Sequence, residues 1–201
     1  GPAGGGGAAV RELALGPLPA FRYWRFSAVS SPDGYWDLSE LVFLDGQGVK
    51  IPAVYSTTTT AFDFIGGSDP PTVLQALGDS VYGTRVVAFN NTAMAAPGWH
   101  LQLDLGSAIS PASLRQVHAI GTRYATTFTL SGSADGVTFT PVMTGATWSV
   151  AAPVENSGAS VPMPLEALSF GESERGEFAM SGNTLYWCRA SGTPGTWQAI
   201  N

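Results

Sequence analysis

Short apolar and aromatic runs, separated by turn residues, fill most of the chain from Phe21 onward. Runs of this kind, rich in β-branched and aromatic side chains, are typical of β-strands. The predicted strands are Phe21–Val29, Leu38–Leu44, Val49–Tyr55, Val86–Phe89, Trp99–Leu105, Leu114–Ile120, Phe128–Ser131 and Thr138–Val142. Many short strands at this spacing predict an all-β fold, an antiparallel β-sandwich of the jelly-roll type.

The regions that flank these strands have a different composition. Residues 1–19 are rich in Gly and Pro and predict a flexible leader, either a linker or a remnant of cloning, with one helical turn over Arg11–Leu15. Residues 20–150 form the predicted sandwich domain. Residues 151–170 are rich in Pro, Ala and Ser without periodicity, which indicates a linker or a strap over the surface.

Residues 171–201 predict a small C-terminal β-meander with strands Glu177–Met180, Thr184–Ala190 and Thr196–Ile200. Both faces of its middle strand carry apolar side chains, yet so small a sheet has little of its own to cover them. We therefore expect the meander to pack against other copies of the chain, with a trimer favoured among homo-oligomers.

Composition excludes several classes of partner. The formal net charge is −6, which opposes binding to nucleic acid, and no apolar run is long enough for insertion into a membrane. Charged residues make up only 12% of the chain, which suits closely packed strands. Cys188 is the one cysteine, so an internal disulfide is excluded, and the side chain is expected to be buried.

The sequence offers little for catalysis. Its two histidines, His100 and His118, both fall in predicted strands and are expected to be sheet residues rather than bases. No Gly-x-Ser-x-Gly elbow, phosphate-binding loop or His-Glu-x-x-His pair occurs. We therefore expect a non-enzymatic protein.

Three segments resemble the galactose-binding-like jelly roll of discoidin and coagulation-factor C domains. Leu130–Phe139 resembles the strand, turn and strand around the signature S-x-DG-x-x-W, with Phe139 in place of Trp. Trp99–Gly106 resembles the family's W-x-x-V-DLG strand, and Ala88–Thr92 resembles its A-x-DGN loop. The three occur in the family's order, so the resemblance implies this fold and a role in binding saccharides.

The order of two further segments resembles phage tail and tail-fibre proteins. Arg22–Phe26 and Ser39–Phe43 resemble strands that usually close such modules, but here they come first. Leu185–Trp197 also resembles the end of a tail fibre. The resemblance implies a virion protein of the tail fibre that acts at the host cell surface, where it binds a host-surface glycan and other virion proteins.

The resemblance also implies a structural calcium ion. The positions that match the family's ligands are Glu40, Asn90, Asn91 and Thr92. Asn90 stands where the family has Asp, which removes one negative charge and weakens such a site. The alternative is that Asn90 and Asn91 simply supply turn conformations and side-chain hydrogen bonds.

In the modules that the chain resembles, ligands bind at loops on one end of the sandwich. Sugar recognition uses aromatic rings together with charged or amide groups. In the long connection Ile65–Arg85 and the corner Gly121–Thr126, the residues of these types are Tyr82, Arg85, Arg123 and Tyr124, and a second platform is predicted at Tyr35 and Trp36. Trp24 and Trp99 are expected to be core residues.

Two functions from different classes remain open, and a third, the binding appendage of a glycoside hydrolase, is disfavoured because this sequence contains no catalytic portion. The first is a receptor-binding tail-fibre component whose jelly roll binds host carbohydrate. The second is a purely structural virion protein, a fibre segment or capsid decoration, whose jelly roll joins neighbouring proteins. The sugar and the host are not specified by the sequence.

Overall fold

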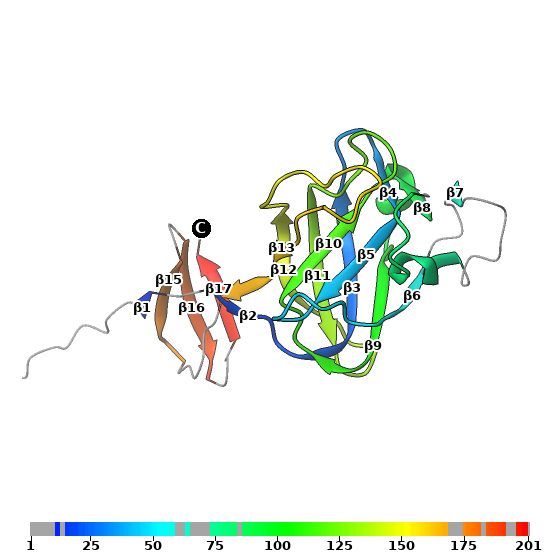
Figure 1. Cartoon of the computed structure of the whole chain (residues 1–201). Helices are drawn as coiled ribbons and strands as arrows, with labels where there is room; N and C mark the ends of the chain where they lie inside the picture. The colour runs from blue at the N-terminus through cyan, green and yellow to red at the C-terminus, as the bar shows by residue number, and fades with distance from the viewer. Residues whose placement is uncertain are drawn as a thin grey trace, which may run out of the picture. The chain divides into compact units, whose positions relative to one another are not determined.

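The computed structural model describes residues 11–12, 15–58, 63–64, 73–83, 86–168, 175–181, 184–191 and 196–200. The chain divides into two compact units, one of residues 18–165 and one that combines residues 1–17 with residues 166–201. Both units are built from β-strands (Figure 1). The predicted all-β class is confirmed.

The first layer of the larger unit is a five-stranded antiparallel sheet with β3 at its centre (Figure 1). Its order is β12 (Thr140–Thr147), β11 (Thr127–Ser133), β3 (Phe21–Ser30), β9 (Leu101–Ile109) and β6 (Val54–Thr57). Every neighbouring pair in this order runs antiparallel.

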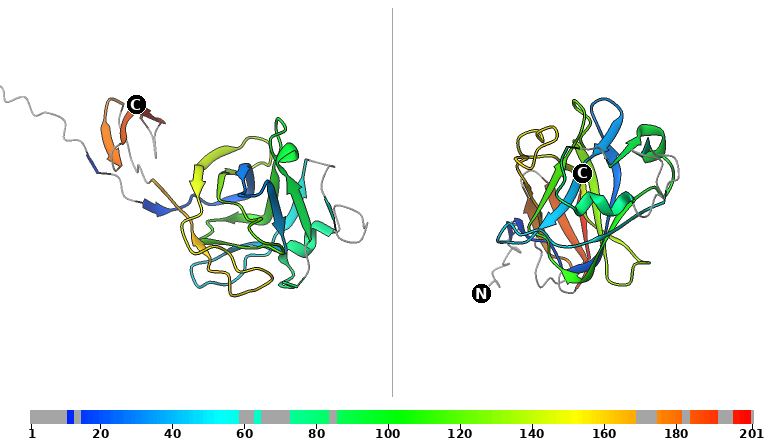
Figure 2. Two further views of the ribbon diagram at one scale, coloured as in Figure 1. Left: turned by 90° about the horizontal axis from the view of Figure 1, so that it is seen from above. Right: turned by 45° about the vertical axis from the view of Figure 1, so that its right-hand side comes forward.

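The second layer consists of two three-stranded sheets that share the chain segment from Tyr35 to Leu44. One has the order β13 (Met163–Pro164), β10 (Ser113–Val117) and β5 (Glu40–Leu44), and the other has β4 (Tyr35–Leu38), β8 (Val87–Asn90) and β7 (Asp63–Phe64). The rings of Phe26 on β3 and Phe43 on β5 stack with centroids 5.8 Å apart, which joins the two layers. The antiparallel β-sandwich is therefore confirmed, and Figure 2 shows the two layers from further directions.

The core forms because side chains alternate along β3. Trp24 and Phe26 point inward and are fully buried, whereas Arg25 and Ser27, which alternate with them, are half-buried on the outer face. Phe26 also contacts Trp36 in an edge-on ring pair and Phe128 in a tilted one. Because aromatic side chains remove large apolar areas from water, this cluster dominates the stability of the sandwich.

A β-bulge shifts the register of β3 against β11 near the C-terminal end of β3. Thr129 pairs with Ser27 but Thr127 pairs with Ser30, so β3 carries one extra residue between these two pairs. Ala28 adopts a positive φ of 48° at this point, a conformation that is uncommon for alanine.

Short helices and irregular segments complete the larger unit. The short helices include the 3₁₀ helix η1 (Gln75–Gly78) and the helical turn α2 (Asn91–Met94). Within the described residues, no helix is both long and apolar enough to span a membrane. The predicted strand Val49–Tyr55 is mostly irregular, since only Val54 and Tyr55 belong to β6 and Pro52 has no N–H for a ladder.

The predicted meander forms in the smaller unit. Strands β15 (Phe178–Ser181), β16 (Thr184–Ala190) and β17 (Thr196–Ile200) pair consecutively, and Cys188 is buried as expected. Two strands from the start of the chain join this unit: β1 (Arg11–Glu12) runs parallel to β15, and β2 (Leu15–Pro17) pairs with β14 (Glu166–Leu168).

These pairings change the predicted organisation of the chain. A helical turn over Arg11–Leu15 was the wrong expectation, because Arg11 and Leu15 both lie in strands that find partners far along the sequence. Residues 151–165 belong to the same compact unit as the sandwich, which favours the predicted strap over the linker, since Met163 pairs with Leu114 and Asn156 donates a backbone hydrogen bond to His118.

Candidate functional site

Two of the predicted ligand residues meet at one end of the sandwich. The guanidinium of Arg123 lies over the ring of Tyr35, 4.5 Å from its centroid. Arg123 Nε donates to Asp33 Oδ2 over 3.2 Å, and Arg123 Nη1 lies 4.0 Å from Asp37 Oδ2. Two carboxylates therefore already balance the charge of Arg123, so this residue fixes the corner beside β4 more than it offers a free cation to a ligand.

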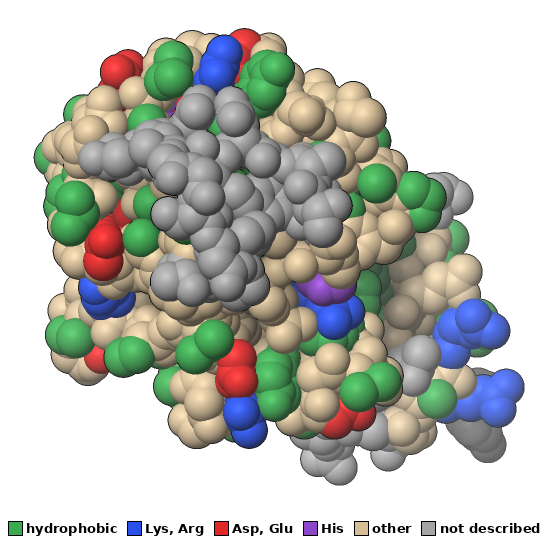
Figure 3. Space-filling model, turned by 90° about the vertical axis from the view of Figure 1, so that its right-hand side faces the viewer, with side chains coloured by type: hydrophobic (Ala, Val, Ile, Leu, Met, Phe, Trp, Pro, Cys, Tyr) green, Lys and Arg blue, Asp and Glu red, His purple; other side chains and the backbone are tan. Residues whose placement is uncertain are grey.

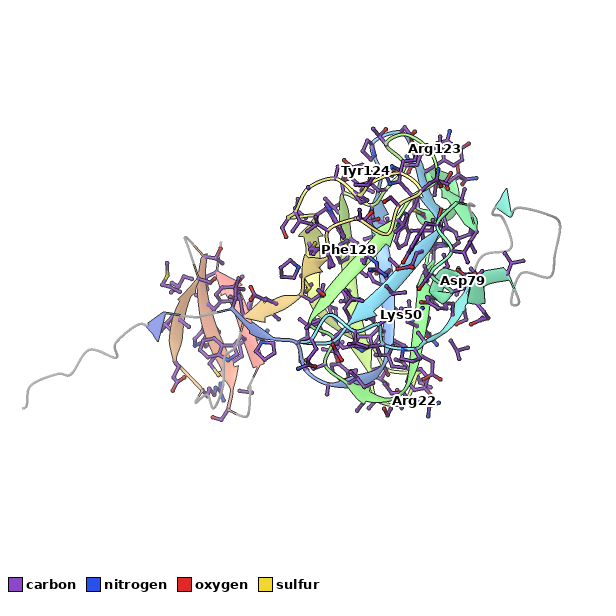
Figure 4. The ribbon with its side chains drawn as sticks, viewed as in Figure 1. Arg22, Lys50, Asp79, Arg123, Tyr124 and Phe128 are labelled. Atoms are coloured by element: carbon purple, nitrogen blue, oxygen red, sulfur yellow. The ribbon has the colours of Figure 1, made fainter. Side chains whose placement is uncertain are left out.

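Tyr124 follows Arg123 at the same end of the sandwich, opposite to the end where Arg22 lies (Figure 4). Its ring is tilted against that of His118, with centroids 5.5 Å apart. His118 is buried and its Nε2 lies 2.6 Å from the carbonyl oxygen of Gly121. We call Asp33, Tyr35, Asp37, Arg123 and Tyr124 the rim cluster.

Trp36 is not part of a binding platform, and this prediction is wrong. Its side chain is 1% exposed, and its Nε1 donates to Gln116 Oε1 over 3.0 Å in the core. The reason is the two-residue period of a strand, which turns Tyr35 outward and Trp36 inward.

The remaining predicted ligand residues do not join the rim cluster. The hydroxyl of Tyr82 accepts a hydrogen bond from Arg115 Nη2 over 3.3 Å. The ring of Tyr82 packs on Gly158 so closely that a Cβ there would lie 2.6 Å from Tyr82 Cε2. Tyr82 thus acts as a packing residue, and Arg85 lies outside the described residues.

The four residues implied for calcium do not converge. Glu40 is fully buried on β5 and forms a 2.6 Å ion pair with Arg115. Asn90 pairs with Tyr35, the first residue of β4. Its Oδ1 accepts from the backbone N–H of Ala93 and caps α2. Asn91 and Thr92 are exposed in α2 itself.

This geometry does not fit a calcium ion. The positive charge that Glu40 requires comes from Arg115, and Asn90 acts as the helix cap, in line with the alternative of a side-chain hydrogen bond. In the part of the chain that the structure describes, no group of three or more His, Cys, Asp or Glu side chains could hold a metal ion.

The motif Ser133-Ala134-Asp135-Gly136 is a hydrogen-bonded turn. Asp135 Oδ1 accepts from the Ser133 hydroxyl and from the backbone N–H groups of Val137 and Thr138, each over 2.8 Å. These hydrogen bonds, with those of the backbone first, lower the pKa of Asp135 to about 2. The turn positions the segment that leads to Phe139.

A hollow lies on the outer face of the five-stranded sheet, and we call it the sheet-face hollow. It has a volume of about 590 Å³. Its lining residues are Arg25, Ser27, Ala28, Met94, Ala95, Ala96, Gly98, Trp99, His100, Ser131 and Phe139. The bulge at Ala28, the segment that follows α2 and the segment before β12 therefore meet over the face formed by Arg25 and Ser131, which pair directly.

Arg25 and Phe139 form the centre of the sheet-face hollow. The guanidinium lies over the ring, 3.7 Å from its centroid, and Arg25 Nε donates to Gln102 Oε1 over 2.9 Å. Partial burial lowers the pKa of Arg25, although it stays cationic at neutral pH. No described Asp or Glu forms an ion pair with Arg25, whereas Arg22, Arg115 and Arg123 each have a carboxylate partner.

His100 and Trp99 supply further polar atoms. His100 Nδ1 lies 2.9 Å from the carbonyl oxygen of Gly98, so Nδ1 carries the proton and Nε2 is the acceptor in the neutral ring. Burial lowers the pKa of His100, and the charge of Arg25 lowers it further. In the view of Figure 3, a histidine side chain lies beside a basic side chain.

Trp99 is 4% exposed and packs edge-on against Phe89, with ring centroids 5.2 Å apart. Its Nε1 is buried, and no described residue accepts a hydrogen bond from it. The expectation that Trp99 belongs to the core is confirmed, yet one edge of the residue lines the sheet-face hollow.

A smaller hollow of about 310 Å³ lies beside Lys50 and Asp79, which Figure 4 places near η1. Lys50 Nζ already donates to the carbonyl oxygen of Gly78 and to Ser80 Oγ. Its charge is engaged within the protein, so we regard the sheet-face hollow as the better candidate.

None of the residues that line the sheet-face hollow was among the predicted ligand residues. A signal for them exists in β3, where the two-residue period places Arg25 and Ser27 on the face opposite to Trp24 and Phe26. The approach of Phe139 and Trp99 to that face depends on loop geometry, which the period does not specify.

Comparison with known proteins found no family model, no curated protein and no solved structure that matches the chain.

Proposed function

We propose that this chain is a non-enzymatic protein that binds saccharides, and that the sheet-face hollow accepts the sugar. The observation that supports this most directly is the combination in one hollow of an aromatic ring, Phe139, with the guanidinium of Arg25 and the hydroxyls of Ser27 and Ser131. Saccharides need an aromatic surface for their apolar face and several donors and acceptors for their hydroxyls.

The lining residues also suit binding better than catalysis. His100 is the one possible general base among them, because Arg25 stays cationic and no lining residue is Asp, Glu, Cys or Lys. A hydrolase would need a nucleophile with its base, or paired carboxylates. A ligand that enters this hollow is therefore held without being cleaved.

The biological setting that we propose rests on the resemblance of the motifs. In this setting the sandwich is a jelly roll on a phage tail fibre, and it attaches the virion to a glycan on the host surface. If the smaller unit joins several copies, simultaneous binding at several hollows strengthens attachment without new contacts.

The test compares two double variants on an array of host-envelope and common glycans. Phe139→Ala with Ser27→Ala removes the ring and one hydroxyl from the hollow, and we expect binding to fall at least about tenfold, as loss of about 1.4 kcal/mol implies. Arg123→Ala with Tyr124→Ala changes the rim cluster, and we expect binding to stay within about twofold of wild type, because it leaves the hollow intact.

The opposite pattern would assign the sugar to the rim cluster. If the wild-type protein bound no glycan and no host cell, the saccharide function would be wrong. The alternative of a structural virion protein would then account for the fold.

A further inference from the structure

The lining of the sheet-face hollow carries positive charge and no negative charge. Arg25 is its one cationic residue at neutral pH, and the lining contains no carboxylate. The other described arginines of the sandwich are all matched by Asp or Glu within 4.0 Å. In a protein of net charge −6, an arginine that is left without an acidic partner and partly buried leaves the hollow selectively positive.

The hydrogen bonds of Arg25 leave one edge of its guanidinium available. Nε is engaged by Gln102, and no described residue accepts a hydrogen bond from the two Nη nitrogens. Two coplanar Nη donors match the two oxygens of a carboxylate, which Arg binds in a bidentate manner. The stacked ring of Phe139 holds the guanidinium plane in place for such a pair.

The neighbours of Arg25 complete the arrangement. His100 Nε2 and the Ser27 hydroxyl remain for neutral sugar hydroxyls. A phosphate monoester would bring almost two negative charges to this one cation, whereas a carboxylate brings one.

We propose that the sheet-face hollow is specific for a saccharide that carries a carboxylate, such as a uronic acid residue, with the carboxylate on the Nη edge of Arg25. This inference rests on the proposed function and names the class of sugar that the same site takes. An acidic glycan of a cell envelope or capsule carries this chemistry.

The experiment measures dissociation constants by calorimetry for an oligosaccharide of glucuronic acid and for its carboxyl-reduced glucose counterpart. For the wild-type protein we expect the acidic probe to bind at least about tenfold more tightly, the size of one charge-assisted hydrogen-bond pair. Arg25→Met should abolish that preference, so that the acidic and the neutral probe bind this variant with dissociation constants within about threefold of each other.

A second pair of variants keeps the test decisive if Arg25→Met fails to fold. Ser27→Asp places a negative charge in the hollow and should weaken the acidic probe at least about tenfold more than the neutral one. Ser27→Asn introduces a side chain of the same shape as Ser27→Asp but without the charge. It should weaken the binding of the two probes about equally.

The outcomes separate the two proposals. Equal affinity for both probes, or equal losses in Arg25→Met, would overturn the acidic specificity and leave saccharide binding in place. Tighter binding of glucose 6-phosphate than of glucuronic acid would replace the carboxylate by a phosphate. Failure of every acidic and neutral sugar to bind would overturn the proposed function itself.

Discussion

Gly132 on β11 lies directly beneath the ring of Phe21, so closely that a Cβ at Gly132 would come within 2.1 Å of Phe21 Cδ2. We therefore expect Gly132→Ala to lower the free energy of unfolding by about 1 to 3 kcal/mol, the usual cost of overpacking. Urea denaturation measures this loss, and Phe21→Ala combined with Gly132→Ala should recover part of it.

Gly46→Ala is the matched control, because nothing lies within 4 Å of a Cβ at that glycine. We expect its free energy of unfolding to stay within about 0.5 kcal/mol of wild type. Equal losses in the two alanine variants would contradict the steric explanation.

The buried ion pair of Glu40 and Arg115 provides a second prediction. Glu40→Ala leaves the guanidinium of Arg115, whose side chain is 18% exposed, without its carboxylate. We expect the free energy of unfolding to fall by about 3 to 5 kcal/mol, as for other buried charges that lose a partner. Asp104→Ala breaks the more exposed pair with Arg22 and should cost much less.

Removal of metal should not change the stability of the protein. Glu40 is paired with Arg115 and Asn90 caps α2, so the predicted calcium ligands have other partners. We expect thermal melting midpoints with calcium and with a chelator to agree. A lower midpoint in chelator would show that a bound metal stabilises the fold.

Acid should destabilise the turn at Asp135. The pKa of this carboxyl is lowered to about 2 from an ordinary value near 3.8, so the folded state favours the ionised form. The stabilisation is complete above pH 3.8 and is lost as the pH falls through 2. Asp135→Asn should therefore be less stable than wild type at neutral pH, and the difference should shrink between pH 4 and 2 in denaturation experiments.

His100 predicts a second pH dependence at higher pH. Its pKa is lowered from the ordinary value of 6.5 by burial and by the charge of Arg25, so folding disfavours the protonated ring. Stability should be complete above pH 6.5 and should decline as the pH falls toward the lowered pKa. His100→Gln should remove this part of the slope, and nuclear magnetic resonance titration of the ring protons gives the pKa directly.

Much of the fold could be predicted from the sequence because strand periodicity and turn residues act locally. The predicted meander strand Thr184–Ala190 matches the structure, and most of the predicted strand Leu38–Leu44 forms β5, although Leu38 belongs to β4. The pairing of Arg11 with Ala179 could not be predicted, because it joins residues that are far apart in sequence and both segments are very short.

The candidate site was harder to predict for a related reason. Residue type identified Arg123 and Tyr35 as ligand residues, and they do meet, but the carboxylates of Asp33 and Asp37 already balance that arginine. Arg25 has the same chemistry within a strand, and what distinguishes it is the lack of a described acidic partner. Such pairing depends on the tertiary structure and not on local pattern.

The smaller unit takes strands from both sides of the sandwich in the sequence, since β1 and β2 precede residues 18–165 and β14 to β17 follow them. During synthesis the sandwich can therefore fold as soon as it leaves the ribosome, whereas β1 and β2 must wait for partners that are translated after it. Chains that stall after the sandwich would carry β1 and β2 unpaired, a form prone to edge-to-edge association until β14 to β17 are translated.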